Sequence, residues 1–86
     1  MEIRWTKRAY KQLNAVPESD RLALYKKVSA LAAEDTRLDI VKLAGLKPRY
    51  RLRVGNYRVI YERVAGVPVI CLILEVKRRT TTTYLN

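Results

Sequence analysis

The chain of 86 residues is long enough for one folded domain with a modest core and too short for two domains. Its 18 lysines and arginines against 8 acidic residues give a net charge of +10, while 49% of the residues are hydrophobic, which excludes a disordered basic tail. A single cysteine and the absence of histidine exclude a disulfide framework and the usual zinc clusters, and we expect neither a metal nor another cofactor. This charge favours a polyanionic partner, with nucleic acid first, an acidic protein second and an anionic membrane surface third.

The sequence does not have the features of a membrane protein. Its amino-terminal residues lack a hydrophobic signal segment. The apolar run at residues 69–74 is much shorter than a membrane span. Cys71 lies within this run and is interpreted as a small core residue. We therefore expect a cytoplasmic protein.

The chain is expected to begin with a short strand and a helix. Residues 2–5 alternate between polar and apolar side chains, which suits a strand, and Thr6 is a good helix N-cap. A first helix is predicted from about Lys7 to Ala15, and Pro17 closes it. Its apolar stripe contains Ala9, Leu13 and Val16, with Tyr10 beside it.

A second helix is expected after Pro17. The acidic group Glu18, Ser19 and Asp20 suits the positive end of a helix dipole. The predicted helix ends near Ala33 or Glu34. Its amphipathic face contains Leu24, Val28, Leu31 and Ala32, flanked by Tyr25.

Residues 35–46 have no clear period and are interpreted as a connection. We expect a turn of helix around Ile40–Leu43, and Gly45 and Pro48 mark the end of the segment. This connection joins a helical half to a strand-rich half.

Residues 50–61 are predicted to form a β-hairpin, because two alternating runs flank the turn dipeptide Gly55-Asn56. With these as the central turn residues, Val54 pairs with Tyr57 and the register continues to the far end of the hairpin. One face then contains Tyr50, Leu52, Val54, Tyr57, Val59 and Tyr61. The other contains Arg51, Arg53, Arg58, Ile60 and Glu62. We expect the first face, including its tyrosines, to be core and the second to be a mostly cationic surface.

In this register Arg53 lies opposite Arg58. A like-charged cross-strand pair costs a few tenths to about 1 kcal/mol. These cations could merely keep a small domain soluble and protect an edge from aggregation. The interpretation we favour is a guanidinium cluster for phosphate, because arginine forks match phosphate oxygens and stay protonated.

The last predicted strand follows a turn at residues 63–68. Val69–Val76 is nearly continuously apolar, which is typical of a strand covered on both faces or placed in the middle of a sheet. Lys77–Tyr84 then brings charge, hydroxyl groups and a phenol to the end of the sheet. This segment is either a frayed basic tail or, because threonine is a β-former, an extension of the sheet.

The order of these elements and the hairpin sequence resemble the RelE/ParE superfamily of bacterial and archaeal toxins. The likeness covers nearly the whole chain and includes Trp5–Ala9, Leu13 before Val16-Pro17, Lys42–Leu46, the hairpin and a basic end with Tyr84. It implies an α+β fold in a single domain of residues 1–86, with a small antiparallel sheet packed against two amino-terminal helices. It also implies neutralisation by a cognate antitoxin.

The resemblance leaves two targets open. RelE-like toxins enter the ribosomal A site and cut mRNA, whereas ParE-like toxins poison DNA gyrase. The positions that RelE-like enzymes use correspond here to Arg51, Arg53, Arg58, Arg78 and Tyr84. This chain departs from the RelE-like pattern at two places. The first hairpin strand has arginines where the best-known members have lysines, and Val76-Lys77 replaces the glycine or Gly-His that commonly precedes the carboxy-terminal arginine. The full set favours a ribosome-dependent endoribonuclease; a gyrase inhibitor without nuclease activity is the alternative, and a plain nucleic-acid-binding module is a third class.

Under the RelE-like interpretation, RNA cleavage without a metal requires a deprotonated 2′-OH and a stabilised phosphate. Tyr84 is the candidate base, since nearby cations favour the phenolate, and Arg58 and Arg78 hold the phosphate oxygens. Arg51 and Arg53 position the backbone. Further cations expected to bind RNA or phosphate are Lys47, Lys77 and Arg79. The expected partners are the antitoxin, mRNA and the ribosome with its rRNA.

Overall fold

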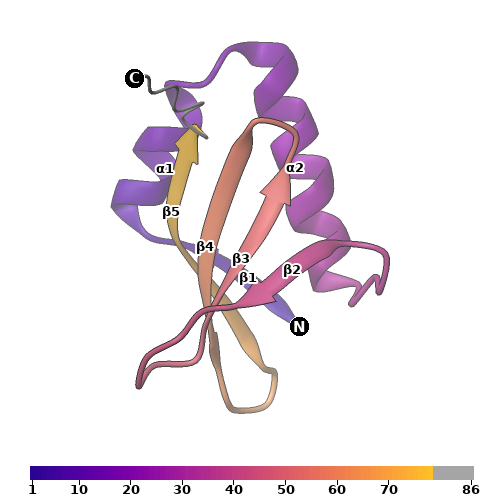
Figure 1. The fold of residues 1–86 in the computed structure, drawn as a ribbon, viewed down its shortest axis with the longest axis vertical. Coiled ribbons are helices and arrows are strands. Elements are labelled where there is room, and N and C mark those ends of the chain that lie inside the picture. The colour runs from indigo at the N-terminus through magenta and orange to yellow at the C-terminus, as the bar shows by residue number, and fades with distance from the viewer. Residues whose placement is uncertain (79–86) are drawn as a thin grey trace, which may run out of the picture.

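Two helices cover one face of a five-stranded sheet in the computed structural model, which describes residues 1–78, and none of the described elements covers the other face (Figure 1). The elements are β1 (Glu2–Trp5), α1 (Lys7–Asn14), α2 (Glu18–Ala32), β2 (Asp39–Lys42), β3 (Arg49–Val54), β4 (Tyr57–Val64) and β5 (Ile70–Arg78). This architecture confirms the expected α+β fold. Neither helix has the length and apolar character needed to cross a membrane.

The sheet is mixed, with the strand order β1-β5-β4-β3-β2. β3, β4 and β5 pair antiparallel, as expected, and β2 adds a further antiparallel strand beside β3, but β1 joins β5 in parallel, from Glu2 opposite Ile70 to Trp5 opposite Ile73. The difference arises because β1 and β5 lie at opposite ends of the sequence, so no turn specifies their relative direction. Because α1 follows β1 directly, this pairing places α1 against the helix-covered face of β5.

The β3–β4 hairpin has the predicted register, with Val54 opposite Tyr57 and Arg53 opposite Arg58. Gly55 has a φ of +56°, a conformation that glycine adopts without the strain of a side chain. The two predicted faces are also confirmed. Leu52 and Val59 are fully buried against the helices, whereas the two arginines are exposed.

Each helix buries most of its predicted stripe, whereas Val16, which lies outside α1, and Ala32 are half-buried. Thr6 caps α1, with its hydroxyl oxygen accepting a hydrogen bond from the Ala9 N–H at 3.1 Å. α1 ends at Asn14, one residue before the expected limit, and Pro17 immediately precedes α2. The core residues contributed by the helices are Ala9, Leu13, Leu24, Val28 and Leu31.

The segment between α2 and β3 differs from expectation. The helical turn expected at Ile40–Leu43 is wrong, because Asp39–Lys42 forms the edge strand β2, paired antiparallel with β3. All four of its residues are exposed, so no buried stripe reveals the strand in the sequence. Pairing with a neighbouring strand, rather than local preference, determines its conformation.

β5 lies between β1 and β4, which confirms a strand in the interior of the sheet. Its helix-facing residues Cys71, Ile73 and Val76 are buried, whereas Leu72 and Leu74 are half-buried. Cys71 is therefore a core residue, as expected. Cover on both faces is not observed among residues 1–78.

A one-residue bulge interrupts the β4–β5 ladder. Tyr61 pairs with Ile73, but the preceding Ile60 pairs with Glu75, so Leu74 is the extra residue on β5. Side chains alternate along a strand, and one extra residue exchanges the faces beyond it. The bulge thus determines which side chains at the end of β5 face the helices.

Two buried core groups predict how stability depends on pH. Burial raises the pKa of Tyr61 from 10.0 to about 12 and that of the Cys71 thiol from 9.0 to about 11. As the pH rises, the unfolded chain therefore loses these protons before the folded protein does. The contribution of the two groups to the free energy of unfolding is complete below about pH 9 and is lost as the pH rises toward 12. Urea unfolding at pH 8 and at about pH 11 should show this fall, and Tyr61→Phe should make it smaller. An equal fall in the variant would contradict the role of Tyr61.

Candidate nucleic-acid interface

Three cations lie in one row across the uncovered face of the sheet. Arg53 of β3 is opposite Arg58 of β4, which in turn is opposite Lys77 of β5. Neighbouring strands are about 4.8 Å apart, so these side chains start from adjacent points on one surface. All three residues are exposed. We call Arg53, Arg58 and Lys77 the cationic row.

Acidic side chains neutralise Lys77 of the row and two other cations on this face. The ion pairs join Arg49 to Glu62 at 3.3 Å, Arg51 to Asp39 at 3.3 Å and Lys77 to Glu75 at 3.4 Å. Within residues 1–78, Arg53 and Arg58 take part in no ion pair or side-chain hydrogen bond. Their guanidinium groups are therefore available to an anion.

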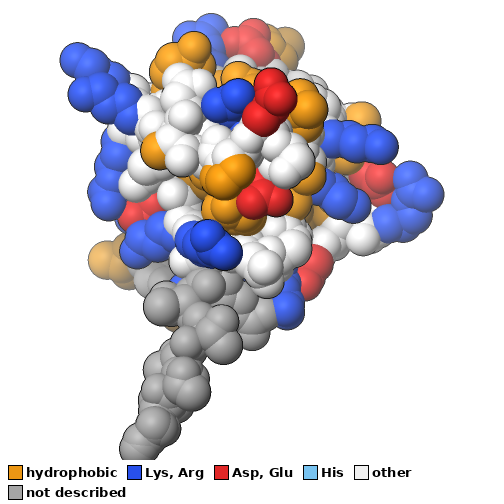
Figure 2. Space-filling view, turned by 90° about the horizontal axis from the view of Figure 1, so that it is seen from above, with side chains coloured by type: hydrophobic (Ala, Val, Ile, Leu, Met, Phe, Trp, Pro, Cys, Tyr) orange, Lys and Arg blue, Asp and Glu red, His pale blue; other side chains and the backbone are white. Residues whose placement is uncertain are grey.

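The positive charge is not confined to this row. Figure 2 shows lysine and arginine side chains around much of the outline of the molecule, with fewer acidic side chains between them. Such a distribution attracts polyanions from a distance, whereas the aligned arginines supply a place for a bound phosphate.

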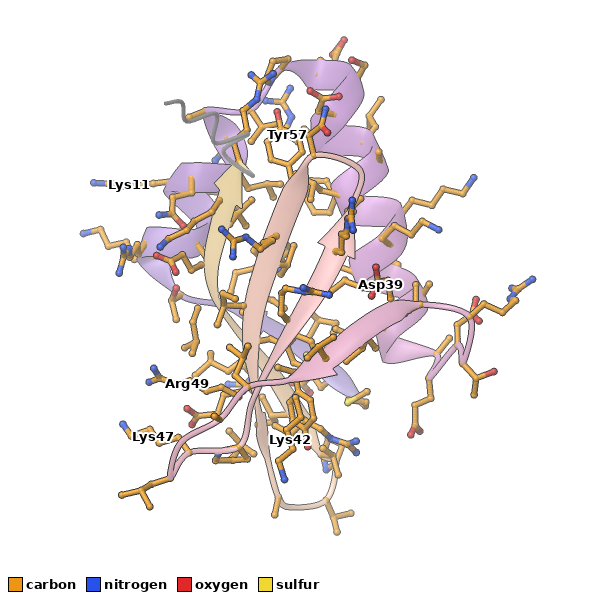
Figure 3. The ribbon with its side chains drawn as sticks, in the orientation of Figure 1. Lys11, Asp39, Lys42, Lys47, Arg49 and Tyr57 are labelled. Carbon is orange, nitrogen blue, oxygen red and sulfur yellow. The ribbon has the colours of Figure 1, made fainter. Side chains whose placement is uncertain are left out.

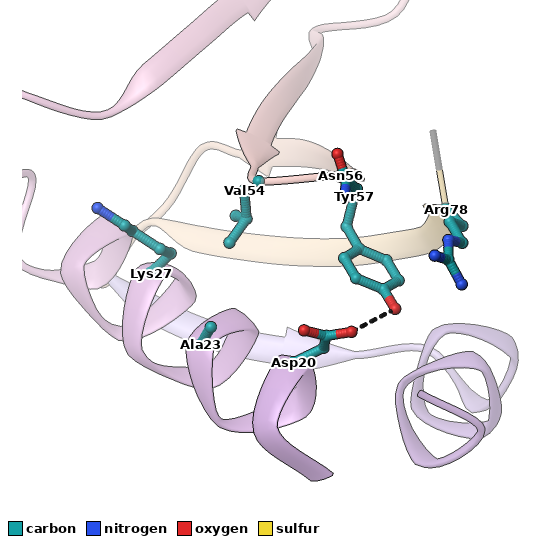
Figure 4. Close-up of a pocket in the computed structure, with 8 residues that line it drawn as sticks. Asp20, Ala23, Lys27, Val54, Asn56, Tyr57 and Arg78 are labelled. Atoms are coloured by element: carbon teal, nitrogen blue, oxygen red, sulfur yellow. Dashed lines mark hydrogen bonds between the residues drawn. The ribbon is translucent and has the colours of Figure 1, made fainter. Parts of the chain in front are cut away.

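Arg78 lies on the other face of the sheet. The bulge places it opposite Tyr57, on the helix side, while its neighbour Lys77 is opposite Arg58. Arg78 lines a cavity of about 340 Å³ with Lys27 of α2 and the β3–β4 turn (Figure 4). The expectation that Arg58 and Arg78 hold the same phosphate oxygens does not fit this register.

Tyr57 connects the hairpin to α2. Its hydroxyl donates a hydrogen bond to Asp20 Oδ2 at 3.0 Å (Figure 4). Burial and, next, this hydrogen bond raise the pKa of Tyr57, while the charge of Arg78 acts in the opposite direction. Tyr57 is thus a neutral structural phenol at neutral pH. The sequence placed it in the core but gave no sign of its contact with Asp20.

The remaining predicted site residues do not all join the cationic row. Lys47 precedes β3 and lies at the opposite end of the molecule from Tyr57 (Figure 3). Arg51 is on the uncovered face, but it is paired with Asp39. Arg79 and Tyr84 lie outside the described residues. Within residues 1–78, no group of three or more cysteine, aspartate or glutamate side chains is placed to hold a metal ion.

Residues 3–82 match the sequence profile of the ParE toxin of the type II toxin-antitoxin system parDE. The chain belongs to this toxin family. No protein with a curated description matches the toxin. The profile covers both helices and all of the sheet except Glu2, and it confirms the resemblance to RelE/ParE toxins.

Three solved structures share the fold of the toxin. The toxin-antitoxin complex RelBE2 from Mycobacterium tuberculosis has 25% identity and a TM-score of 0.76 over 91% of this chain and 96% of that chain. The archaeal RelE-RelB complex from Pyrococcus horikoshii has 27% identity and a TM-score of 0.75 over 94% and 97%. The RelB-RelE complex from Methanococcus jannaschii has 30% identity and a TM-score of 0.66 over 86% and 87%.

Proposed function

We propose that this toxin is a ribosome-dependent endoribonuclease that cleaves mRNA in the A site and so inhibits translation. The supporting observation is the cationic row, in which Arg53 and Arg58 are adjacent, exposed and without an acidic partner among residues 1–78. Adjacent like charges oppose folding, whereas a bound phosphate turns them into a favourable arrangement. Solubility alone does not require the two arginines to be paired.

The proposed reaction is attack of a ribose 2′-OH on the adjacent phosphate, which forms a 2′,3′-cyclic phosphate and releases the next nucleotide as a 5′-hydroxyl that takes its proton from the solvent or a ribosomal group. Arg58 stabilises the charge that develops on the phosphate, and Arg53 and Lys77 hold the flanking backbone. One donor aimed at such charge contributes about 2.7 to 4 kcal/mol to transition-state stabilisation. Arg78, on the opposite face, is assigned to a different part of the RNA.

Tyr84 is proposed as the base that takes the 2′-OH proton. A phenol ordinarily titrates near 10, and cations placed close to it would favour the phenolate. A phenol and guanidinium groups make a weak nuclease in isolation. The proposal therefore requires the ribosome to hold the RNA in line for attack.

A cognate antitoxin is the proposed protein partner. The three similar structures described above are complexes of a toxin with an antitoxin. The net charge of +10 favours an acidic antitoxin segment, and such a segment could fold as it binds.

Inhibition of DNA gyrase is the second candidate function. It is favoured by the profile match, because the matching family is that of ParE. A gyrase inhibitor would use the same fold without a nuclease site. Neither the wild type nor variants of the cationic row would then cleave mRNA.

Mapping mRNA ends on translating ribosomes separates the two candidates. Purified toxin should produce new 5′ ends within the A-site codon and leave gyrase supercoiling unchanged. Intact mRNA together with gyrase-dependent DNA breaks would instead support the second candidate. RNA binding without mRNA cleavage or DNA breaks would indicate the third class, a plain nucleic-acid-binding module.

A further inference from the structure

The edge strand β2 places a carboxylate beside the cationic row. Asp39 is opposite Arg53 in the β2–β3 ladder, so its side chain emerges on the uncovered face (Figure 3). Its Oδ1 accepts a hydrogen bond from Nη2 of Arg51, two residues along β3, at 3.3 Å. Diagonal neighbours on paired strands are within reach of long side chains. Asp39 therefore draws Arg51 toward the edge of the sheet.

Arg51 is incompletely satisfied in this arrangement. Its side chain is 26% exposed, and its Nε is buried without a hydrogen-bond partner. A guanidinium has five N–H donors in a fixed fork, and the contact with Asp39 uses one of its nitrogens. Arg51 thus retains donors that suit a phosphate, but the carboxylate of Asp39 occupies Nη2, one of its two terminal nitrogens.

The strand that supplies Asp39 is weakly held. β2 has four residues, all exposed, and pairs on one side only, with β3. Asp39 itself is 54% exposed, and an ion pair at this exposure contributes little to stability. Replacing its charge should therefore leave the fold intact.

We propose that Asp39 is a positioning residue that withholds Arg51 from the RNA backbone and so limits the affinity of the cationic row. This inference rests on the proposed binding of RNA at this face. When the carboxylate is neutralised, Arg51 turns from the sheet edge toward Arg53 and Arg58 and adds a fourth cation to the site. The toxin would then bind single-stranded RNA more tightly through one additional phosphate contact.

The test compares RNA affinity in the full-length toxin and in Asp39→Asn. The probe is a fluorescent oligouridylate, with binding measured between about 50 and 200 mM salt. One added phosphate contact on a single strand should steepen the slope of log K against log salt by about 0.7, which corresponds to a several-fold gain in affinity at the lowest salt. Unchanged thermal unfolding would show that the variant is folded.

Two matched variants isolate the role of Arg51. Glu18→Gln removes an equal charge from the exposed start of α2 and should leave the slope unchanged. In the Arg51→Gln background, Asp39→Asn should bring no gain, because the two residues act as a unit. The combination is informative even if either single variant loses some stability.

The possible outcomes separate this inference from the proposed function. Equal behaviour of Asp39→Asn and Glu18→Gln, a gain that survives Arg51→Gln, or no RNA binding by any variant would overturn the role of Asp39. A steeper slope that depends on Arg51 supports it, even if ribosomes show no mRNA cleavage. Cleavage by the wild-type toxin without any effect of Asp39→Asn would leave the proposed function standing and reject the positioning role.

Discussion

Replacing Arg58 with alanine is expected to slow mRNA cleavage on the ribosome by about 10²- to 10³-fold. Arg58 is exposed and has no ion pair within residues 1–78, so the loss should come from the unstabilised phosphate rather than from the fold. The free energy of unfolding should change by no more than about 0.5 kcal/mol. Single-turnover cleavage and urea unfolding of the same preparation measure the two effects.

Lys11→Ala is the matched control for Arg58→Ala. Lys11 lies on α1, outside the uncovered face, and its loss lowers the net charge by the same amount (Figure 3). Its cleavage rate should stay close to that of the wild type. If both variants lose activity equally, then overall charge, and not the cationic row, determines cleavage.

Replacing Leu52 with alanine is expected to lower the free energy of unfolding by about 2.7 to 5 kcal/mol. Leu52 is fully buried, faces the helices from β3 and lies opposite Val59, also fully buried. Its removal leaves a cavity in the core that residues 1–78 form, in a small domain whose total stability is on the order of 5 to 15 kcal/mol. Urea unfolding at neutral pH measures the loss.

Val41→Ala provides the comparison on the same sheet. Val41 is 45% exposed on β2, opposite Arg51, so its truncation should change the free energy of unfolding by no more than about 0.5 kcal/mol. A loss as large as that of Leu52→Ala would mean that the uncovered face is buried in solution, for example by association of two copies.

The hairpin was predictable because its determinants are local. Gly55-Asn56 specifies a two-residue turn, and the alternation on either side fixes which residues face the core. The same holds for the helices, where Thr6 and Pro17 mark the starts and apolar spacing marks the buried stripes. From these features alone Arg51, Arg53 and Arg58 could be assigned to one surface.

Features set by distant partners could not be predicted in this way. β2 has no buried residue and is a strand only because β3 lies beside it, so the sequence suggested a helical turn. The parallel pairing of β1 with β5 joins the first and last described strands of the sheet. Neither contact leaves a periodic signal in the chain.

The bulge at Leu74 had the largest consequence for the site. Alternation counted without interruption from the buried Cys71 and Ile73 would place Lys77 on the helix side and Arg78 beside Arg58. The extra residue reverses this assignment, so Lys77 completes the cationic row. Asp39 was missed for a related reason, because its strand was not recognised.

The central claim, that Arg58 touches the phosphate being cleaved, can be measured with a single sulfur atom. Messages containing one phosphorothioate at the scissile position, separated into their two diastereomers, are cleaved on the ribosome by the wild-type toxin and by Arg58→Ala. We expect one diastereomer to slow the wild type and to have no further effect on the variant, because both changes remove the same contact. The same sulfur effect in both proteins would contradict the account.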